Sequence, residues 1–69
     1  MEMIPVDSSS IEAFGYDPSL GDLVIIFKRG GRRRYTYHSV STVEFAEFLS
    51  APSKGSFIAT EIKPNKRFS

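Results

Sequence analysis

The chain has 69 residues, a formal net charge of +1 and no cysteine. A chain of this length has room for one domain with one core. The lack of cysteine excludes disulfides, thiolate metal sites and thiol nucleophiles. The N-terminal residues lack the basic and apolar regions of a signal peptide, and no run approaches the roughly 18 apolar residues of a membrane span. We therefore expect a soluble, cytoplasmic protein.

Two apolar segments in the first half of the chain indicate β-strands. Residues 11–16 (IEAFGY) and 23–27 (LVIIF) are rich in the aromatic and β-branched side chains that strands favour, and the turn-forming sequence DPSLGD (17–22) separates them. The glycine pair at 30–31 predicts a tight reversal, after which residues 32–38 return as a third strand. The sequence therefore predicts a three-stranded antiparallel meander.

A helix follows, because the apolar period changes at residue 40. Ser41 and Glu44 have the spacing of a capping box, and Val40 and Phe45 occupy the two positions of a hydrophobic staple. These signals predict a helix that begins at Ser41. Its apolar stripe is expected to consist of Val43, Ala46 and Leu49, flanked by Phe45 and Phe48.

The remaining residues predict a second, shorter helix. APSKG (51–55) ends the first helix, and the apolar residues within 56–63 are spaced as in a short helix rather than a strand. Pro64 ends this segment, and residues 64–69 are expected to form a frayed tail. We predict a single α+β domain over residues 6–63, with one or two short C-terminal helices covering the meander, after an irregular lead-in at 1–5.

Charge is distributed unevenly along the chain. Residues 1–27 contain five acids and no lysine or arginine, whereas residues 28–38, which we call the basic hairpin, contain five cations and no acid. A hairpin tip is often polar merely because it is exposed. A concentrated positive patch is also typical of an electrostatic docking site.

The position of the two tyrosines in the basic hairpin depends on the length of its loop. With a two-residue loop, Tyr35 and Tyr37 lie on the face opposite to Leu23 and Ile25, where they could stack bases beside Arg33. With a three-residue loop, they pair with Ile25 and Leu23 and join the core. The small core of so short a chain favours the buried arrangement.

An ordered set of short motifs resembles the KTSC domain, a small bacterial domain that is also found at the C-terminus of some lysyl-tRNA synthetases. The resemblance covers residues 6–62. Its motifs are Val6-Asp7-Ser8-Ser9-Ser10-Ile11, Gly15-Tyr16-Asp17, the alternating Leu23, Ile25 and Phe27, Gly30, Tyr35-Thr36-Tyr37, Val40, Leu49 and Ala51-Pro52-Ser53-Lys54-Gly55-Ser56-Phe57. The hairpin tip is longer and more basic than the family pattern, and Ser41 stands where proline is common. The association with a tRNA synthetase implies a link to RNA, which is an argument by association.

Two binding functions are compatible with these residues. In the first, the protein binds RNA or an RNA-associated protein through the basic hairpin and its tyrosines. The candidate nucleic-acid-binding residues are Lys28, Arg29, Arg32, Arg33, Tyr35, Tyr37 and Lys54. In the second, it is a protein–protein interaction module that uses the basic hairpin or an exposed sheet edge.

We do not expect an enzyme. His38 is the single histidine, and no base or orienting group is predicted to lie beside Ser8, Ser9 or Ser10. The spacings of known metal sites are also missing. The sequence therefore predicts no catalytic residue, metal or cofactor.

Overall fold

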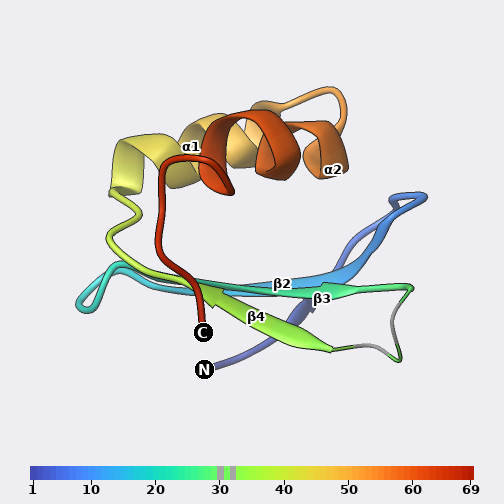
Figure 1. Cartoon of the computed structure of the whole chain (residues 1–69), viewed down its shortest axis with the longest axis horizontal. Helices are drawn as coiled ribbons and strands as arrows, with labels where there is room; N and C mark the ends of the chain where they lie inside the picture. The colour runs from blue at the N-terminus through green and yellow to red at the C-terminus, as the bar shows by residue number, and fades with distance from the viewer. Residues whose placement is uncertain (30, 32) are drawn as a thin grey trace.

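The chain folds into an antiparallel sheet with a helical layer over one face (Figure 1). This computed structural model describes residues 1–29, 31 and 33–69. The strands pair in the order β1-β2-β3-β4. The elements are β1 (Ile4–Pro5), β2 (Ile11–Asp17), β3 (Asp22–Phe27), β4 (Arg34–Tyr37), α1 (Thr42–Ser50), α2 (Lys54–Phe57) and the π-helix η1 (Ile58–Ile62).

The α+β class is confirmed, but the sheet has four strands rather than the predicted three. The additional strand, β1, lies in the segment predicted to be irregular and pairs Ile4 with Phe14 and Pro5 with Ala13. Proline has no N–H to donate, so it suits a strand at the sheet edge. A two-residue strand is too short to show an alternating pattern, which explains why the sequence did not reveal it.

The pairing of β3 with β4 decides where the tyrosines lie. Ile25 is opposite Tyr35 and Leu23 is opposite Tyr37. This register is the one expected for the longer of the two loops, and it places both tyrosines on the core face. Tyr37 is only 2% exposed. The alternative, with both rings on the open face of the sheet, is therefore wrong.

The β3–β4 connection is only partly described. Gly30 and Arg32 lie outside the described residues, so the tight reversal predicted at 30–31 and the predicted contact of Arg32 stay predictions. Gly31 has a φ of 73°, which glycine adopts readily. The paired part of β4 is shorter than the predicted strand at 32–38.

Helix α1 begins as predicted but buries a different face. Ser41 is the N-cap, and Glu44 completes the capping box with bonds of 3.0 and 3.1 Å. Phe48 is fully buried, whereas Val43 is 68% and Leu49 46% exposed. The prediction that Val43, Ala46 and Leu49 form the buried stripe is therefore wrong. The two phenylalanines bury more area against the sheet, and they determine which face of the helix turns inward.

The second helical segment is confirmed as a helix rather than a strand. α2 continues directly into η1, and the buried side chains of this segment are Ile58 and Ile62. Near its start, α2 packs closely on the loop before β2. A Cβ atom at Gly55 would overlap the hydroxyl of Ser10, so glycine permits this approach.

The C-terminal residues return from the helical layer to the sheet (Figure 1). Thr36 and Ser69 exchange two backbone hydrogen bonds of 3.0 Å each, and the N–H of His38 donates to the carbonyl of Arg67 at 2.9 Å. Tyr37 and Phe68 form an antiparallel bridge. The prediction of a frayed tail is wrong for these residues, because they cover the outer edge of β4.

One apolar core lies between the sheet and the helices. It consists of Ile11, Phe14, Leu23, Ile25, Tyr37, Val40, Phe48, Ile58 and Ile62. Within the described parts of the chain, every helix is too short or too polar to cross a membrane.

The capping box makes stability depend on pH. The backbone N–H of Ser41 donates a hydrogen bond to the Glu44 carboxylate, and the Lys66 ammonium group lies 2.9 Å from the same carboxylate. The hydrogen bond from Ser41, and then the contact with Lys66, hold the pKa of Glu44 below its ordinary value of 4.5. A carboxyl whose pKa is lowered by folding stabilises the fold above its unfolded pKa, and this stabilisation is lost as pH falls through the folded value. We therefore expect the free energy of unfolding to fall as the pH drops below 4.5.

The measurement is urea denaturation at several pH values between about 6 and 3, with the wild type and Glu44→Gln. The variant should be less stable near neutral pH and should lose less stability on acidification. Some slope will remain, because the hydroxyl of Ser19 lowers the pKa of Asp17. Glu47→Gln, on an exposed position of α1, is the control. Identical pH profiles for wild type and Glu44→Gln would contradict the expectation.

Candidate nucleic-acid interface

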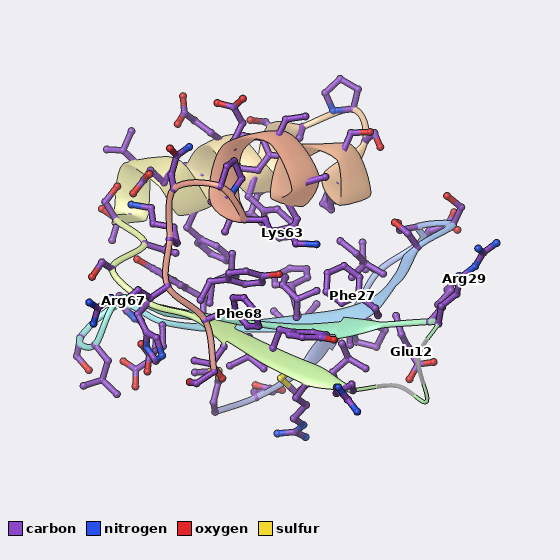
Figure 2. All side chains as sticks on the ribbon, viewed as in Figure 1. Glu12, Phe27, Arg29, Lys63, Arg67 and Phe68 are labelled. Atoms are coloured by element: carbon purple, nitrogen blue, oxygen red, sulfur yellow. The ribbon has the colours of Figure 1, made fainter. Side chains whose placement is uncertain are left out.

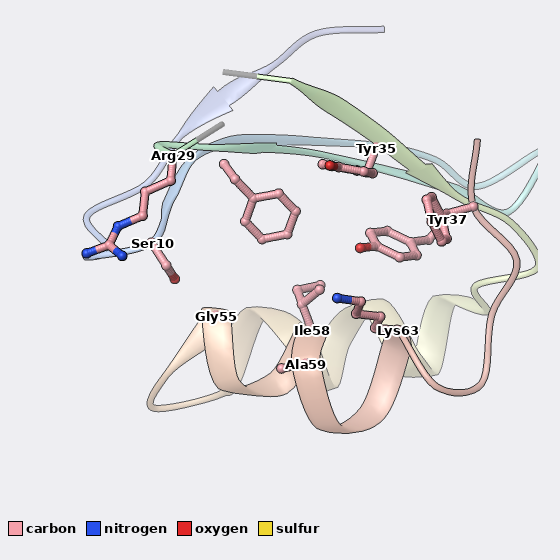
Figure 3. A pocket seen from close by; sticks show the side chains of 10 residues that line it. Ser10, Arg29, Tyr35, Tyr37, Gly55, Ile58, Ala59 and Lys63 are labelled. Atoms are coloured by element: carbon pink, nitrogen blue, oxygen red, sulfur yellow. The ribbon is translucent and has the colours of Figure 1, made fainter. Parts of the chain in front are cut away.

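An open cavity of about 480 Å³ separates part of the sheet from the second helical segment (Figure 3). Side chains from β3, β4 and the C-terminal residues form one wall, and Ile58 and Ala59 of η1 form the other. Arg29 and Ser10 lie at one end, while Lys63 and Tyr37 lie at the other (Figure 3). We call this space the aromatic cavity.

Four aromatic side chains form the sheet-side wall of the aromatic cavity. The ring centroids of Phe27 and Tyr35 are 5.5 Å apart, those of Tyr35 and Phe68 are 5.6 Å apart, and those of Tyr37 and Phe68 are 5.9 Å apart. These spacings are typical of rings in edge-to-face or tilted contact. The half-buried Tyr35 and the exposed Phe68 both present ring surface to a ligand.

The hydroxyl of Tyr37 reaches the cavity without a protein partner. The Tyr37 side chain is buried, yet its hydroxyl forms no hydrogen bond with any residue that the structure describes. No described side chain has a buried nitrogen or oxygen atom that lacks a hydrogen-bond partner. The unbonded Tyr37 hydroxyl is therefore accessible from the cavity. Burial, and then the proximity of Tyr35, raise the pKa of Tyr37, so its hydroxyl keeps its proton at neutral pH. It is therefore a donor that faces the cavity.

Lys63 is a second donor at the same end. It directly follows the π-helix η1, whose last bond joins the Lys63 N–H to the Ile58 carbonyl at 2.7 Å. Figures 2 and 3 show its side chain between the helix and the sheet. Its ammonium group has no ion pair or hydrogen bond within the described part of the chain. By contrast, Lys66 pairs with Glu44, and Lys54 donates to the carbonyl of Leu49 at 3.1 Å.

The structure separates the predicted binding residues into three groups. Arg29, Tyr35 and Tyr37 line the aromatic cavity. Lys28 and Arg33 are exposed on the basic hairpin and do not line the aromatic cavity. Lys54 follows Ser53, the N-cap of α2, but its ammonium group is already bonded to α1.

Three of the charged and aromatic residues that line the cavity are not predicted as binding residues by the sequence. Phe27 shares a face with Leu23 and Ile25, so strand alternation could have paired it with the tyrosines. Lys63 and Phe68 depend on the course of the chain after η1. No local pattern in the sequence indicates that course.

A second cavity has the wrong charge for a phosphate. It has a volume of about 440 Å³ and lies beside β1, where it is lined by Tyr16, Phe45 and N-terminal residues. Its charged side chains, Glu2 and Asp17, are both acidic. An anionic ligand would therefore be repelled there.

Asp22, His38 and Ser69 form a hydrogen-bonded chain. His38 Nδ1 lies 3.0 Å from Asp22 Oδ1, and His38 Nε2 lies 2.9 Å from Ser69 Oγ. Serine hydrolases use the same groups in this order, but here they lie outside both cavities. These hydrogen bonds link Ser69 to Asp22 of β3 through His38, the residue that follows β4. Within the described ranges, no group of three or more His, Asp or Glu side chains could hold a metal ion.

The hydroxyls of Tyr16 and Tyr37 predict different responses to the same substitution. Tyr16 donates to the Val40 carbonyl at 2.6 Å, whereas the Tyr37 hydroxyl has no such partner among the described residues. We expect Tyr16→Phe to lower the free energy of unfolding by about 1–2 kcal/mol, because it leaves that carbonyl unpaired. Tyr37→Phe should change it by less than about 0.5 kcal/mol. Urea denaturation of both variants checks this. Equal losses would show that the Tyr37 hydroxyl has a structural partner.

Comparisons with known proteins agree with the motifs found in the sequence. The model of the KTSC domain family matches residues 7–68. A protein from Tsukamurella paurometabola is 42% identical over 65 residues, which cover 94% of each chain. The crystal structure of a KTSC domain protein from Yersinia pestis superposes with a TM-score of 0.90 at 35% identity, covering 99% of this chain and 93% of that one. The chain therefore belongs to the KTSC domain family.

Proposed function

We propose that this protein is a non-catalytic module that binds single-stranded RNA. The observation that carries the proposal is the aromatic cavity, which opens next to the basic hairpin and has Arg29 and Lys63 at its two ends. Proteins that bind single strands combine aromatic surfaces, on which bases stack, with cations that follow the phosphates. Both features occur here, since aromatic rings line the cavity and Arg29 and Lys63 lie at its ends.

The basic hairpin supplies cations that are free to contact phosphates. Arg29, Arg33 and Arg34 form no ion pair with any described residue, although acids are numerous in the first third of the chain. Lys28 is exposed beside Arg29. Three or four phosphate contacts in this region would fix the path of a strand without reading its sequence.

The two tyrosines take different roles in this proposal. Tyr35 is half-buried, and its ring is open to a base, together with Phe68. Tyr37 is too deeply buried to stack a base, so its contribution is a hydrogen bond from its hydroxyl. This differs from a surface on which both tyrosine rings stack bases.

A protein–protein interaction module is the alternative, in which the basic hairpin or a sheet edge would bind the partner. Neither sheet edge offers a long free strand, because β1 has two residues and residues 67–69 cover the outer edge of β4. The observation that favours a protein partner is instead the exposed apolar face of α1. Val43 and Leu49 are 68% and 46% exposed there.

An amide chemical-shift titration with a short single-stranded RNA distinguishes the two functions. We expect the largest shifts at Arg29, Tyr35, Lys63 and Phe68, and small shifts along α1. The affinity should fall with salt, with a log–log slope of roughly −3 for four or five phosphate contacts. Absence of binding at low ionic strength, or shifts confined to α1, would refute the proposal.

A further inference from the structure

The end of the aromatic cavity between β4 and η1 combines two unpartnered donors. The Tyr37 hydroxyl and the Lys63 ammonium group point into the same space from opposite walls (Figure 3). Neither has a protein partner among the residues described. The Tyr37 hydroxyl is accessible from the cavity, so it can donate a hydrogen bond to a ligand that enters there. The described residues that line the cavity include no aspartate or glutamate, so none of them neutralises Lys63.

The chain itself closes this end of the cavity. Lys63 lies on the helical wall and Phe68 on the sheet wall, and residues 64–67 connect them. Hydrogen bonds from Thr36 and His38 hold residues 67–69 on β4. A strand of RNA that enters past Arg29 therefore cannot continue straight beyond Lys63.

We propose that this closed end binds the terminal phosphate of a nucleotide, carried by an RNA strand or by a free mononucleotide. The inference rests on the proposed function for its RNA ligand. A terminal phosphate carries a charge between −1.5 and −2 at neutral pH, according to the general behaviour of phosphate monoesters, whereas an internal phosphodiester carries about −1. Lys63 therefore attracts the terminal group more strongly, and the Tyr37 hydroxyl donates one hydrogen bond to it.

The base attached to this phosphate lies against the aromatic wall. Tyr35 is next to Tyr37 on the same face of β4, and Phe68 contacts both rings. The cavity volume of about 480 Å³ is within the range of small-ligand sites. The site thus requires two parts of a ligand, a dianionic group and a planar apolar one.

The test compares one short RNA sequence with a 5′-phosphate, with a 3′-phosphate, and with hydroxyls at both ends. We expect one phosphorylated form to bind about tenfold more tightly than the unphosphorylated form, the size of effect expected for a hydrogen bond to a charged group. This preference should disappear in Lys63→Gln and in Tyr37→Phe. Lys28→Gln, on the exposed hairpin, is the matched control. It should weaken all three RNAs equally and keep the preference.

Titrations with adenosine 5′-monophosphate, adenosine and inorganic phosphate separate this inference from the proposed function. The nucleotide should bind more tightly than either of its parts. If all three RNAs bind equally well, or if the preference survives both substitutions, the terminal-phosphate site is refuted while RNA binding stands. If no RNA binds but the nucleotide binds in a manner that needs Lys63, RNA binding is refuted and the phosphate site stands. If inorganic phosphate binds as tightly as the nucleotide, the aromatic wall has no part in the site and the inference fails.

Discussion

Phe48→Ala is expected to lower the free energy of unfolding by about 3–5 kcal/mol. Phe48 has no exposed surface, and its ring meets that of Phe14 edge-to-face at 5.3 Å. It also contacts Phe45 and Phe57, so it joins α1, the second helical segment and β2. Removing the ring leaves a cavity at the junction of three elements. A domain of this size has little stability to spare.

Urea denaturation, followed by circular dichroism, measures this loss. Leu49→Ala is the matched control, because Leu49 is the next residue in α1 and is 46% exposed. It should cost less than about 1 kcal/mol. If Leu49→Ala were as destabilising as Phe48→Ala, the helix would bury the stripe that the sequence predicted, and the observed orientation of α1 would be wrong.

Neutralising three hairpin cations is expected to weaken RNA binding about 100-fold at low salt. The variant combines Lys28→Gln, Arg29→Gln and Arg33→Gln, so it removes three of the proposed phosphate contacts at roughly 1 kcal/mol each. The log–log slope with salt should change from roughly −3 to about −1. Fluorescence anisotropy with a labelled single-stranded RNA measures both quantities.

A control with the same change in net charge isolates the position of the cations. Val43→Glu, Ala46→Glu and Leu49→Glu place three negative charges on the exposed face of α1, away from the aromatic cavity. This variant should weaken RNA binding far less than the hairpin variant does. Equal weakening would mean that net charge alone governs binding. A loss confined to the α1 variant would place the interface on the helix.

The features that were predictable from the sequence depend on residues close together in the chain. Ser41 and Glu44 are three positions apart, and the capping box they form defines the start of α1. The strands β2 and β3 were equally visible, because their apolar residues and the turn between them are contiguous. The family resemblance likewise came from short local motifs.

Features that depend on long-range packing were only partly predictable. The local pattern allows two registers of β3 and β4, and only the small size of the core favours the observed one, in which the tyrosines are on the core face. The prediction for the buried face of α1 is wrong because two adjacent faces of that helix are apolar. The sequence predicts Arg29, Tyr35 and Tyr37 as binding residues but not the aromatic cavity that they line, because Lys63 and Phe68 reach it through the return of the chain to β4.

The strand order β1-β2-β3-β4 also has a consequence for the rate at which the protein folds. Each strand pairs with its neighbour in the chain, so most of the sheet forms by closing short loops. The pairing of residues 67–69 with β4 is different, because it joins segments separated by both helices. Domains rich in local contacts fold quickly, and long closures follow once their partners are in place. We therefore expect the hairpins to form early along the folding pathway and the end of the aromatic cavity beside Lys63 and Phe68 to be completed last.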